Sequence, residues 1–308
     1  LLLQCSRHVC IFMKEIIPAI DRAVILDELS KLDMLRTTRH GANEIYIFNA
    51  QSSPNLMREV GRLRELSFRS GGGGSGNELD VDADDMAQDG YEQLIAWDPV
   101  AQEIIGGYRF IICRDSQPAH LSTEHYFNFS QQFRDEYLPH TLELGRAFVS
   151  GSGDAMKSIY ALDNLWDGIG ALLKTHPEVK YLLGKVTMYS SYNIEARNMF
   201  FYFLRKYYPD TDRLVEGIHP LKMNINTELY DALFTGANFD EDYKILRSRI
   251  RDHEEIIPPM FNAYINLTAS MRVFDSVHNP ELGDVYETGI LVPVESIYPD
   301  KYERYTTW

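Results

Sequence analysis

Residues 142–153 read LELGRAFVSGSG, and a long amphipathic run follows them. An apolar segment that carries one acid and one base, ends in glycines and leads into a helix is typical of a strand holding an anionic or thioester substrate. Glu143 and Arg146 are three residues apart, so on an extended strand they should point to opposite faces. One of them must then enter the core or a cleft. A buried carboxylate has either a hydrogen-bonding or ionic partner or a catalytic role, such as taking a proton from an amine. The alternative is that this segment is a solvated strand end.

Composition limits the classes of protein to consider. The chain has 308 residues, is 44% hydrophobic and carries a net charge of −15, which favours a folded globular protein and argues against a nucleic-acid partner. Three scattered cysteines are too few for a disulfide framework or a zinc site. We therefore expect a reducing, cytoplasmic location and no metal.

The first 43 residues are expected to be a leader and a helical extension. Residues 1–12 are apolar but too short to span a bilayer, and we place no function in them. A helical pattern begins at Met13 and includes Ile16, Ile20, Val24 and Leu26.

Local patterns predict alternating strands and helices through most of the chain. Ser53 and Pro54 are typical of a helix start, and Asp154 is a plausible cap for the helix that follows the glycines. Gly106 and Gly107 predict a bulge or a close backbone approach. Strands are expected at 44–48, 92–98, 104–113, 180–189 and 284–294, and helices at 54–68, 154–173, 194–207, 227–234, 240–251 and 258–271. Residues 120–140 should form a loop with a short helix, and residues 302–308 a tail.

Two segments before the first long strand have unusual composition. Residues 70–76 read SGGGGSG and resemble a flexible linker. Residues 78–85 contain five carboxylates, which could bind a cation, orient a substrate amine or be solvated. A calcium loop is excluded because its glycine and terminal glutamate are missing.

Basic residues gather in two places despite the negative net charge. The two clusters are Arg58, Arg62, Arg64 and Arg69, and Lys244, Arg247, Arg249 and Arg251. Either cluster could meet an acidic protein or anionic headgroups, and solvated helix faces are the alternative.

Four ordered motifs resemble those of the acyl-homoserine-lactone synthases and their relatives in the GNAT superfamily. They are Arg64-x-x-x-Phe68, Asp82-x-x-Asp85, Gly106-x-x-Arg109 and Glu143-x-x-Arg146. Three further stretches resemble a closer group, the hemolysin-like N-acyltransferases that make ornithine and glycine lipids and the N-acyl amino acid synthases. These are LELGR (142–146), LWDGI (165–169) and IPPM (257–260) with Tyr264.

The resemblance covers about residues 44–295, between the extension 1–43 and a tail 296–308. It implies an α/β, GNAT-like acyltransferase fold, with a mixed central sheet splayed at the active-site strand and flanked by helices. It also implies transfer of a (3-hydroxy) fatty acyl group from the phosphopantetheine thioester of acyl carrier protein to an amino acid amine. No tightly bound cofactor and no covalent acyl-enzyme are expected. The lipid product would place the enzyme at the inner face of the cytoplasmic membrane, in peripheral contact with it.

The resemblance also assigns site residues. Glu143 would be the general base or a water-orienting acid, and Tyr192, or alternatively Tyr189, would protonate the leaving thiolate. The substrate cleft would be built and braced by Arg64, Phe68, Asp82, Asp85, Arg109 and Arg146, and the acyl-pantetheine would lie on Phe148, Val149, Gly151 and Gly153. The structural alternatives are that the arginine–carboxylate pairs only join the first helix to the sheet, and that Phe148 and Trp166 belong to the core.

Two departures from the family patterns bear on the substrates. The segment FVSGSG (148–153) has the glycines of a coenzyme A loop but lacks its polar residue, and glycines replace the tryptophan expected after Phe68. We therefore expect acyl carrier protein as donor and a small amino acid, glycine before ornithine, as acceptor, with Arg109 or Arg64 anchoring its carboxylate. The alternatives are a coenzyme-A-dependent N-acetyltransferase and a catalytically silent acyl-binding protein.

Overall fold

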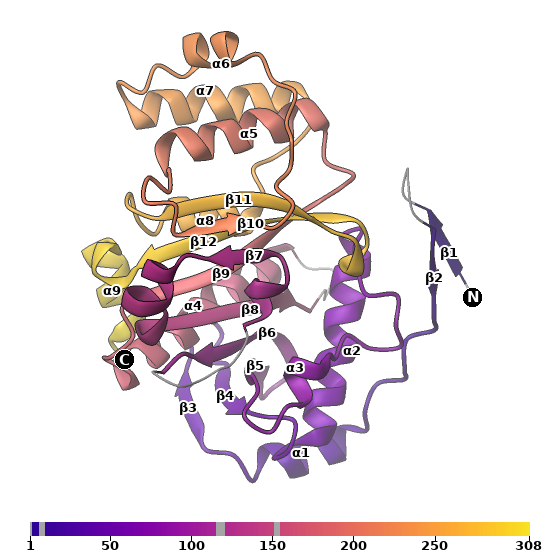
Figure 1. The fold of residues 1–308 in the computed structure, drawn as a ribbon. Helices are drawn as coiled ribbons and strands as arrows, with labels where there is room; N and C mark the ends of the chain where they lie inside the picture. Colours follow the sequence, from indigo (N-terminus) through magenta and orange to yellow (C-terminus); the bar gives the residue numbers. More distant parts are fainter. Residues whose placement is uncertain (1, 6–9, 115–120, 151–154) are drawn as a thin grey trace.

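The computed structural model describes residues 2–5, 10–114, 121–150 and 155–308, and an eight-stranded sheet runs through its centre (Figure 1). The strand order is β11-β12-β9-β8-β6-β5-β4-β3, and β8 and β9 form the parallel pair in an otherwise antiparallel sheet. The strands are β3 (Met34–Thr37), β4 (Glu44–Phe48), β5 (Glu92–Asp98), β6 (Glu103–Ile112), β8 (Thr141–Val149), β9 (Tyr181–Tyr189), β11 (Arg272–Asn279) and β12 (Val285–Pro293). The predicted mixed α/β sheet is confirmed.

Strands β8 and β9 pair over only part of their length. Their register runs from Thr141 opposite Tyr181 to Leu144 opposite Gly184 and ends there. Both strands continue for five more residues, to Val149 and Tyr189, without pairing to each other. The sheet is therefore splayed at β8, as predicted, and this divergence creates the space for a site.

Helices cover both faces of the sheet. On β5, the alternate residues Leu94 and Ala96 join the core that contains α4 (Ala155–Thr175), whereas Ile95 and Trp97 join the core of α1 (Arg22–Leu29) and α2 (Pro54–Ser70). This alternation is expected for a strand buried on both faces. The glycines of β6 permit close packing, because a Cβ on Gly107 would lie 2.6 Å from the Leu94 carbonyl oxygen.

The start of α2 differs from expectation. Ser53 makes no side-chain hydrogen bond to the helix. Instead, the Glu28 carboxylate of α1 accepts hydrogen bonds from the backbone N–H groups of Asn55 and Leu56, at 3.1 and 2.8 Å. The predicted serine cap is wrong, since a tertiary contact supplies the acceptor.

Two end segments pack against the sheet and α4. β3 pairs with β4, and its Arg36 lies 3.7 Å from the buried Asp167 carboxylate of α4, so the sheet begins before residue 44. The helix expected from Met13 is limited to α1. Helix α9 (Pro299–Thr306) lies against α4, where a Cβ on Gly170 would be 2.1 Å from the Tyr305 carbonyl oxygen. The prediction of a mobile tail is therefore wrong.

A layer of helices lies beyond β11, at the top of Figure 1. It contains α5 (Ile194–Tyr207), α6 (Thr227–Leu233) and α7 (Phe239–Asp252), each within one residue of its predicted range. The next helix, α8 (Pro259–Ile265), is shorter than the predicted helix 258–271. Phe203 of α5 joins this layer through ring contacts to Phe234 and Phe239 at centroid distances of 5.3 and 5.8 Å. Among the described residues, no helix combines the length and apolar character needed to cross a membrane.

The glycine-rich segment 70–76 is an ordered loop. The buried Glu65 carboxylate of α2 accepts hydrogen bonds from the backbone N–H groups of Ser75 and Gly76, at 2.9 and 2.8 Å. Gly72, Gly74 and Gly76 all have positive φ, which explains the glycines. The resemblance to a flexible linker was misleading.

Candidate active site

A cleft of about 880 Å³ opens where β8 and β9 diverge. Residues 145–149 of β8 and 185–189 of β9 form its two walls. Its polar end includes Asp82, Arg109, Ser122, Arg146, Lys185 and Glu287, and its apolar part includes Leu162, Leu165, Val186, Met188 and Met260. Phe68 lines the cleft from α2. A second cavity of about 640 Å³, beside α1 and α2, is lined by none of the predicted site residues that the structure describes.

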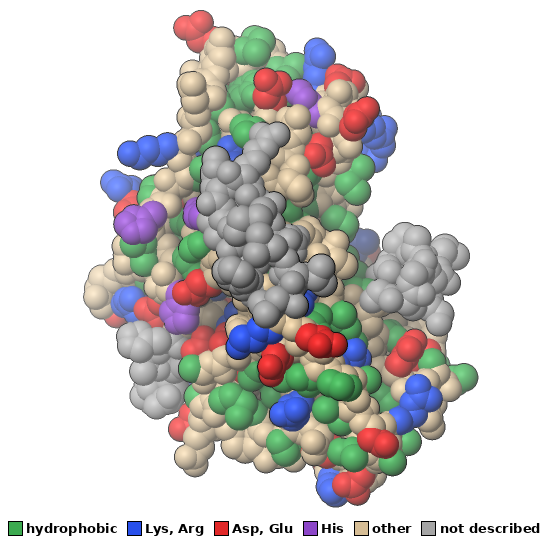
Figure 2. All heavy atoms as spheres, turned by 90° about the vertical axis from the view of Figure 1, so that its right-hand side faces the viewer, with side chains coloured by type: hydrophobic (Ala, Val, Ile, Leu, Met, Phe, Trp, Pro, Cys, Tyr) green, Lys and Arg blue, Asp and Glu red, His purple; other side chains and the backbone are tan. Residues whose placement is uncertain are grey.

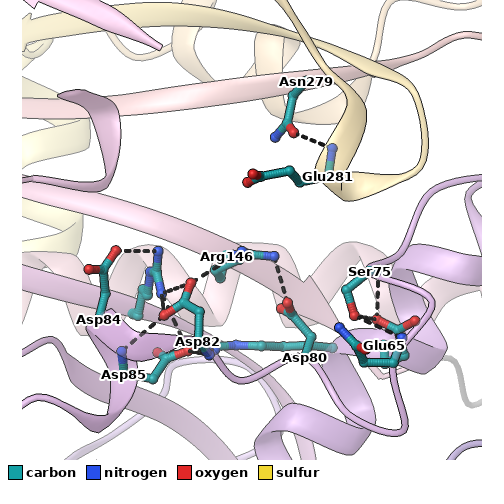
Figure 3. Close-up of polar contacts among 12 residues, drawn as sticks. Glu65, Ser75, Asp80, Asp82, Asp84, Asp85, Arg146, Asn279 and Glu281 are labelled. Carbon is teal, nitrogen blue, oxygen red and sulfur yellow. Dashed lines mark hydrogen bonds and ion pairs between the residues drawn. The ribbon is translucent and has the colours of Figure 1, made fainter. Parts of the chain in front are cut away.

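An arginine–carboxylate network forms one side of the polar end (Figure 3). Arg109 Nη1 donates to both oxygens of Asp82 at 2.7 Å, and Arg146 donates to Asp82 at 3.2 Å and to Asp80 at 2.6 Å. Asp82 also caps the short helix α3 (Ala83–Met86), and Asp85 returns the hydrogen bond in a capping box. Three of the predicted residues, Asp82, Arg109 and Arg146, therefore meet on the cleft wall.

Arg146 does not point away from Glu143 as an extended strand would require. Its φ is 53°, in the left-handed region. Arg146 and Ala147 together oppose the single residue Tyr108 on β6, so β8 has a bulge here. The extra residue turns Arg146 to the face that carries Arg109, and the prediction of opposite faces is wrong.

Arg64 lies below the cleft wall. It is fully buried, its guanidinium donates to both oxygens of Asp85 at 3.2 and 3.1 Å, and it also donates to Gln93. Burial alone would raise the pKa of Asp85, but Arg64 and Arg109 overcome this and hold the pKa well below its usual range. Neither Arg64 nor Asp85 lines the cleft, so their contacts are those of the structural alternative, a buried link between α2, α3 and the sheet.

Glu143 is fully buried and saturated with hydrogen bonds. Its Oε1 accepts from Ser122 Oγ and the Thr123 backbone N–H, both at 3.0 Å, and from the Thr123 hydroxyl, while Oε2 accepts from the Tyr91 hydroxyl. Tyr91 also lies under Arg109, whose Cζ is 4.6 Å from the ring centroid. Ser122 lines the cleft, whereas Glu143 lies behind it. The role of Glu143 as a base stays a prediction, and Ser122 is the cleft residue to which it is hydrogen-bonded.

The remaining predicted residues line other parts of the cleft or fall outside the described chain. Phe68, Phe148 and Val149 line the cleft. Tyr192 also lines it and donates its hydroxyl proton to the Ile256 carbonyl at 2.9 Å; burial raises the pKa of Tyr192. Gly151 and Gly153, and the expected cap Asp154, fall outside the described residues. Trp166 packs edge-on against Tyr264 at 5.6 Å, which joins two of the family motifs in the core.

The cleft residues that were not predicted include three at its polar end, Ser122, Lys185 and Glu287. Lys185 Nζ donates to Ser122 Oγ at 3.1 Å, and Glu287 lies on the neighbouring strand β12. The signal in the sequence was a charged residue inside a segment of buried-strand composition, KYLLGKVTMY for Lys185 and DVYETGILVPV for Glu287.

Comparison with known proteins finds a matching domain family and several similar proteins. Residues 63–161 match the acetyltransferase (GNAT) domain family. Two relatives, from Phocaeicola vulgatus and Bacteroides thetaiotaomicron, are named glycine N(alpha)-acyltransferase and are 45% identical over 95% of this chain, covering 93% and 90% of their own lengths. A solved CoA-dependent acyl-homoserine lactone synthase, BjaI with MTA, is also similar, with a TM-score of 0.28 and 17% identity over 47% of this chain and 66% of that one. The protein is thus an N-acyltransferase, and the chain belongs to the glycine Nα-acyltransferase family of the GNAT superfamily.

Proposed function

We propose that this enzyme transfers a long-chain (3-hydroxy)acyl group from the phosphopantetheine thioester of acyl carrier protein to the α-amine of glycine. The observation that carries the proposal is the two-part cleft. One continuous cavity of about 880 Å³ is lined by cationic and anionic side chains on the face that carries Arg109 and by aliphatic side chains on the face that carries α4. Such a cavity fits a small charged acceptor beside a long apolar donor chain.

The register of the splayed strands shows how the two parts are arranged. Leu182 and Val186 belong to the core that contains α4, so Lys185 and Thr187 point to the opposite face of β9. The apolar part therefore opens toward α4 and the polar end toward Arg109 and Ser122. A thioester lying between β8 and β9 would have its acyl chain on the first side and its carbonyl carbon near the second.

The choice of donor rests on the apolar wall and on the loop after β8. The wall offers Leu162, Leu165, Met188 and Met260, more than an acetyl group needs. Phe148 and Val149 stand where a coenzyme A loop would carry a polar residue for the pyrophosphate. Both features favour a carrier-bound fatty acyl chain over acetyl coenzyme A.

The acceptor is proposed to be glycine, by analogy with the names of the relatives. Arg109 remains a candidate anchor for its carboxylate because it lines the cleft, whereas the buried Arg64 does not. Arg146 also lines the cleft and is a further candidate. The product, an N-acyl amino acid with a long chain, would partition into the cytoplasmic membrane, where we place the enzyme.

The test is a matrix of donors and acceptors. Purified enzyme is offered 3-hydroxypalmitoyl carrier protein, palmitoyl-CoA or acetyl-CoA with glycine, ornithine, serine or a polyamine, and products are identified by mass. N-acylglycine formed fastest from the carrier protein supports the proposal. Faster transfer from acetyl-CoA would favour the N-acetyltransferase alternative, and absence of thiol release from every donor would favour the silent acyl-binding protein.

A further inference from the structure

Lys185 and Glu287 bring opposite charges to the polar end of the cleft. Glu287 lies opposite Thr187 in the pairing of β12 with β9, so it shares a face with Lys185 on the adjacent strand. Both side chains line the cleft. Among the described residues, no ion pair joins them, so the two side chains do not neutralise each other by direct contact.

Glu287 has an unused acceptor. It is 6% exposed, and within the described part of the chain no donor reaches its Oε2 atom. A buried carboxylate oxygen without a partner is costly, and a ligand with N–H donors would remove that cost. Glu287 therefore points to an ammonium group as its ligand.

Lys185 is held by a directed chain of hydrogen bonds. Its Nζ donates to Ser122 Oγ at 3.1 Å, and Ser122 Oγ in turn donates to Glu143 Oε1 at 3.0 Å. Because Glu143 fixes the Ser122 hydroxyl proton, the free lone pair of Ser122 receives an N–H from Lys185. The remaining substituents of the Lys185 nitrogen then face the cleft.

Four charged groups act on Lys185. Burial lowers the pKa of the Lys185 ammonium, and Arg109 and Arg146 lower it further, while Glu287 and Glu143 act in the opposite direction. A lysine whose ammonium is destabilised in this way can be neutral when the substrate binds, which is the state required of a general base.

We propose that Lys185 and Glu287 form the amine site for the acceptor, in which Glu287 binds the ammonium group of the amino acid and neutral Lys185 removes one of its protons. This inference rests on the proposed transfer to an amino acid amine. The freed nitrogen lone pair attacks the thioester carbonyl and forms the C–N bond. Collapse of the intermediate breaks the C–S bond, the second nitrogen proton goes to the leaving thiolate, and Lys185 returns its proton to solvent. Glu143 is then a positioning residue that acts through Ser122.

The decisive variant is Lys185→Arg, because arginine keeps the hydrogen-bond donors but stays protonated and cannot accept a proton. We expect kcat to fall about 10²–10⁴-fold, with a smaller change in KM for the amine. Lys180→Arg, on an exposed lysine just before β9, is the matched control and should behave like wild type. Wild-type turnover by Lys185→Arg would overturn the assignment.

A second measurement leaves Lys185 in place. At saturating amine, kcat should rise with pH as Lys185 loses its proton, so the ascending limb of the pH profile reports the pKa of Lys185. Glu287→Gln removes a negative charge that raises the pKa of Lys185, so this limb should move to lower pH, and KM for the amine should rise because the ammonium loses its partner. Glu295→Gln, on an exposed glutamate just after β12, is the control. A limb that stays in place or moves to higher pH would contradict the proposal.

Different results would contradict the choice of glycine as acceptor and the assignment of the amine site. If wild-type enzyme acylates an amine other than glycine, the choice of acceptor is wrong, and the same variants are measured with that amine. If wild type produces N-acylglycine and Lys185→Arg and Glu287→Gln retain its kcat, KM and pH profile, only the amine site is wrong. Thermal unfolding of each variant shows whether a loss of activity reflects a loss of fold.

Discussion

Glu143 accepts a hydrogen bond from Ser122 at 3.0 Å, and of these two residues only Ser122 faces the cleft. Glu143→Gln places an amide N–H₂ against donors that now approach a carboxylate, so it should destabilise the fold by about 1–3 kcal/mol and misplace Ser122. We expect kcat to fall about a hundredfold, near the lower limit for a lost proton-transfer group. Steady-state kinetics and thermal unfolding check both effects.

A double-mutant cycle separates direct from indirect action of Glu143. If Glu143 acts through Ser122, the double variant Glu143→Gln/Ser122→Ala should be no slower than the slower single variant. Tyr91→Phe removes a different donor from the same carboxylate and should lose stability with less effect on kcat. Multiplicative losses in the double variant would instead indicate that Glu143 meets the substrate independently of Ser122.

Asp85 should make stability depend on pH in the acid range. Its folded pKa lies below its unfolded value of about 3.9, so its contribution is present above that pH and is lost as pH falls further. Asp85→Asn breaks a buried pair and should cost about 3–5 kcal/mol near pH 7. The difference from wild type should shrink as pH falls below about 4. Urea unfolding at a series of pH values measures the difference in free energy of unfolding between wild type and Asp85→Asn, and Asp89→Asn, at an exposed residue, is the control. A difference that does not change with pH would contradict the ion-pair role of Asp85.

The glycine-rich loop offers a matched pair of substitutions. Gly72 and Gly74 both have positive φ, but a Cβ on Gly74 would lie 2.8 Å from Arg69 Cγ, whereas one on Gly72 would meet nothing within 4 Å. The left-handed backbone should lower the free energy of unfolding of both alanine variants by about 1–2 kcal/mol. Gly74→Ala should lower it more, because Arg69 must also move. Equal melting temperatures would show that the loop is less tightly held by Glu65 than the hydrogen bonds indicate.

The sequence predicted the strands that are long and buried, and it located the acid of the active-site strand. It missed β3 and β11, because MLRT is short and RVFDSVHN carries charged residues and a register shift that interrupts its alternation. The left-handed backbone of Arg146 could not be predicted either, because a bulge in β8 depends on how β8 pairs with β6. Each of these features is set by contacts between distant segments.

The amine site could not be predicted from one sequence, because contacts between distant segments form it. Ser122, Lys185 and Glu287 belong to a loop, to β9 and to β12, and only the register of the sheet brings them together. Motifs shared with lactone synthases pointed instead to Arg64 and Asp85, whose contacts are internal to the fold. A charged residue within a buried strand was the one usable signal.

The last prediction concerns where acyl carrier protein docks. Lys244, Arg247 and Arg251 of α7 are exposed and spaced three and four apart, so they form one stripe, and no ion pair engages them among the described residues. The chain that follows α7 lines the cleft with Glu255 and Ile256. In the other basic cluster, Arg62 is paired with Glu59 at 2.5 Å, and Arg69 binds Glu65, Lys14 and Asn77.

The charge of the α7 stripe is opposite to the net charge of the chain. On the face shown in Figure 2, acidic and basic side chains are interspersed, and the whole chain carries −15. An acidic carrier protein would therefore be repelled over most of the surface and steered by a local basic stripe. We expect Lys244→Glu/Arg247→Glu to raise KM for the acyl carrier protein at least about tenfold at low salt, the lower end of steering effects, with kcat preserved.

The matched control is Arg62→Glu, which reverses the charge of a basic residue on α2. High salt should reduce the difference, and KM for a free acyl-pantetheine thioester should not change, because that donor lacks the protein partner. A larger effect from Arg62→Glu would move the docking surface to α2, and unchanged KM in both variants would mean that charge does not guide the carrier protein.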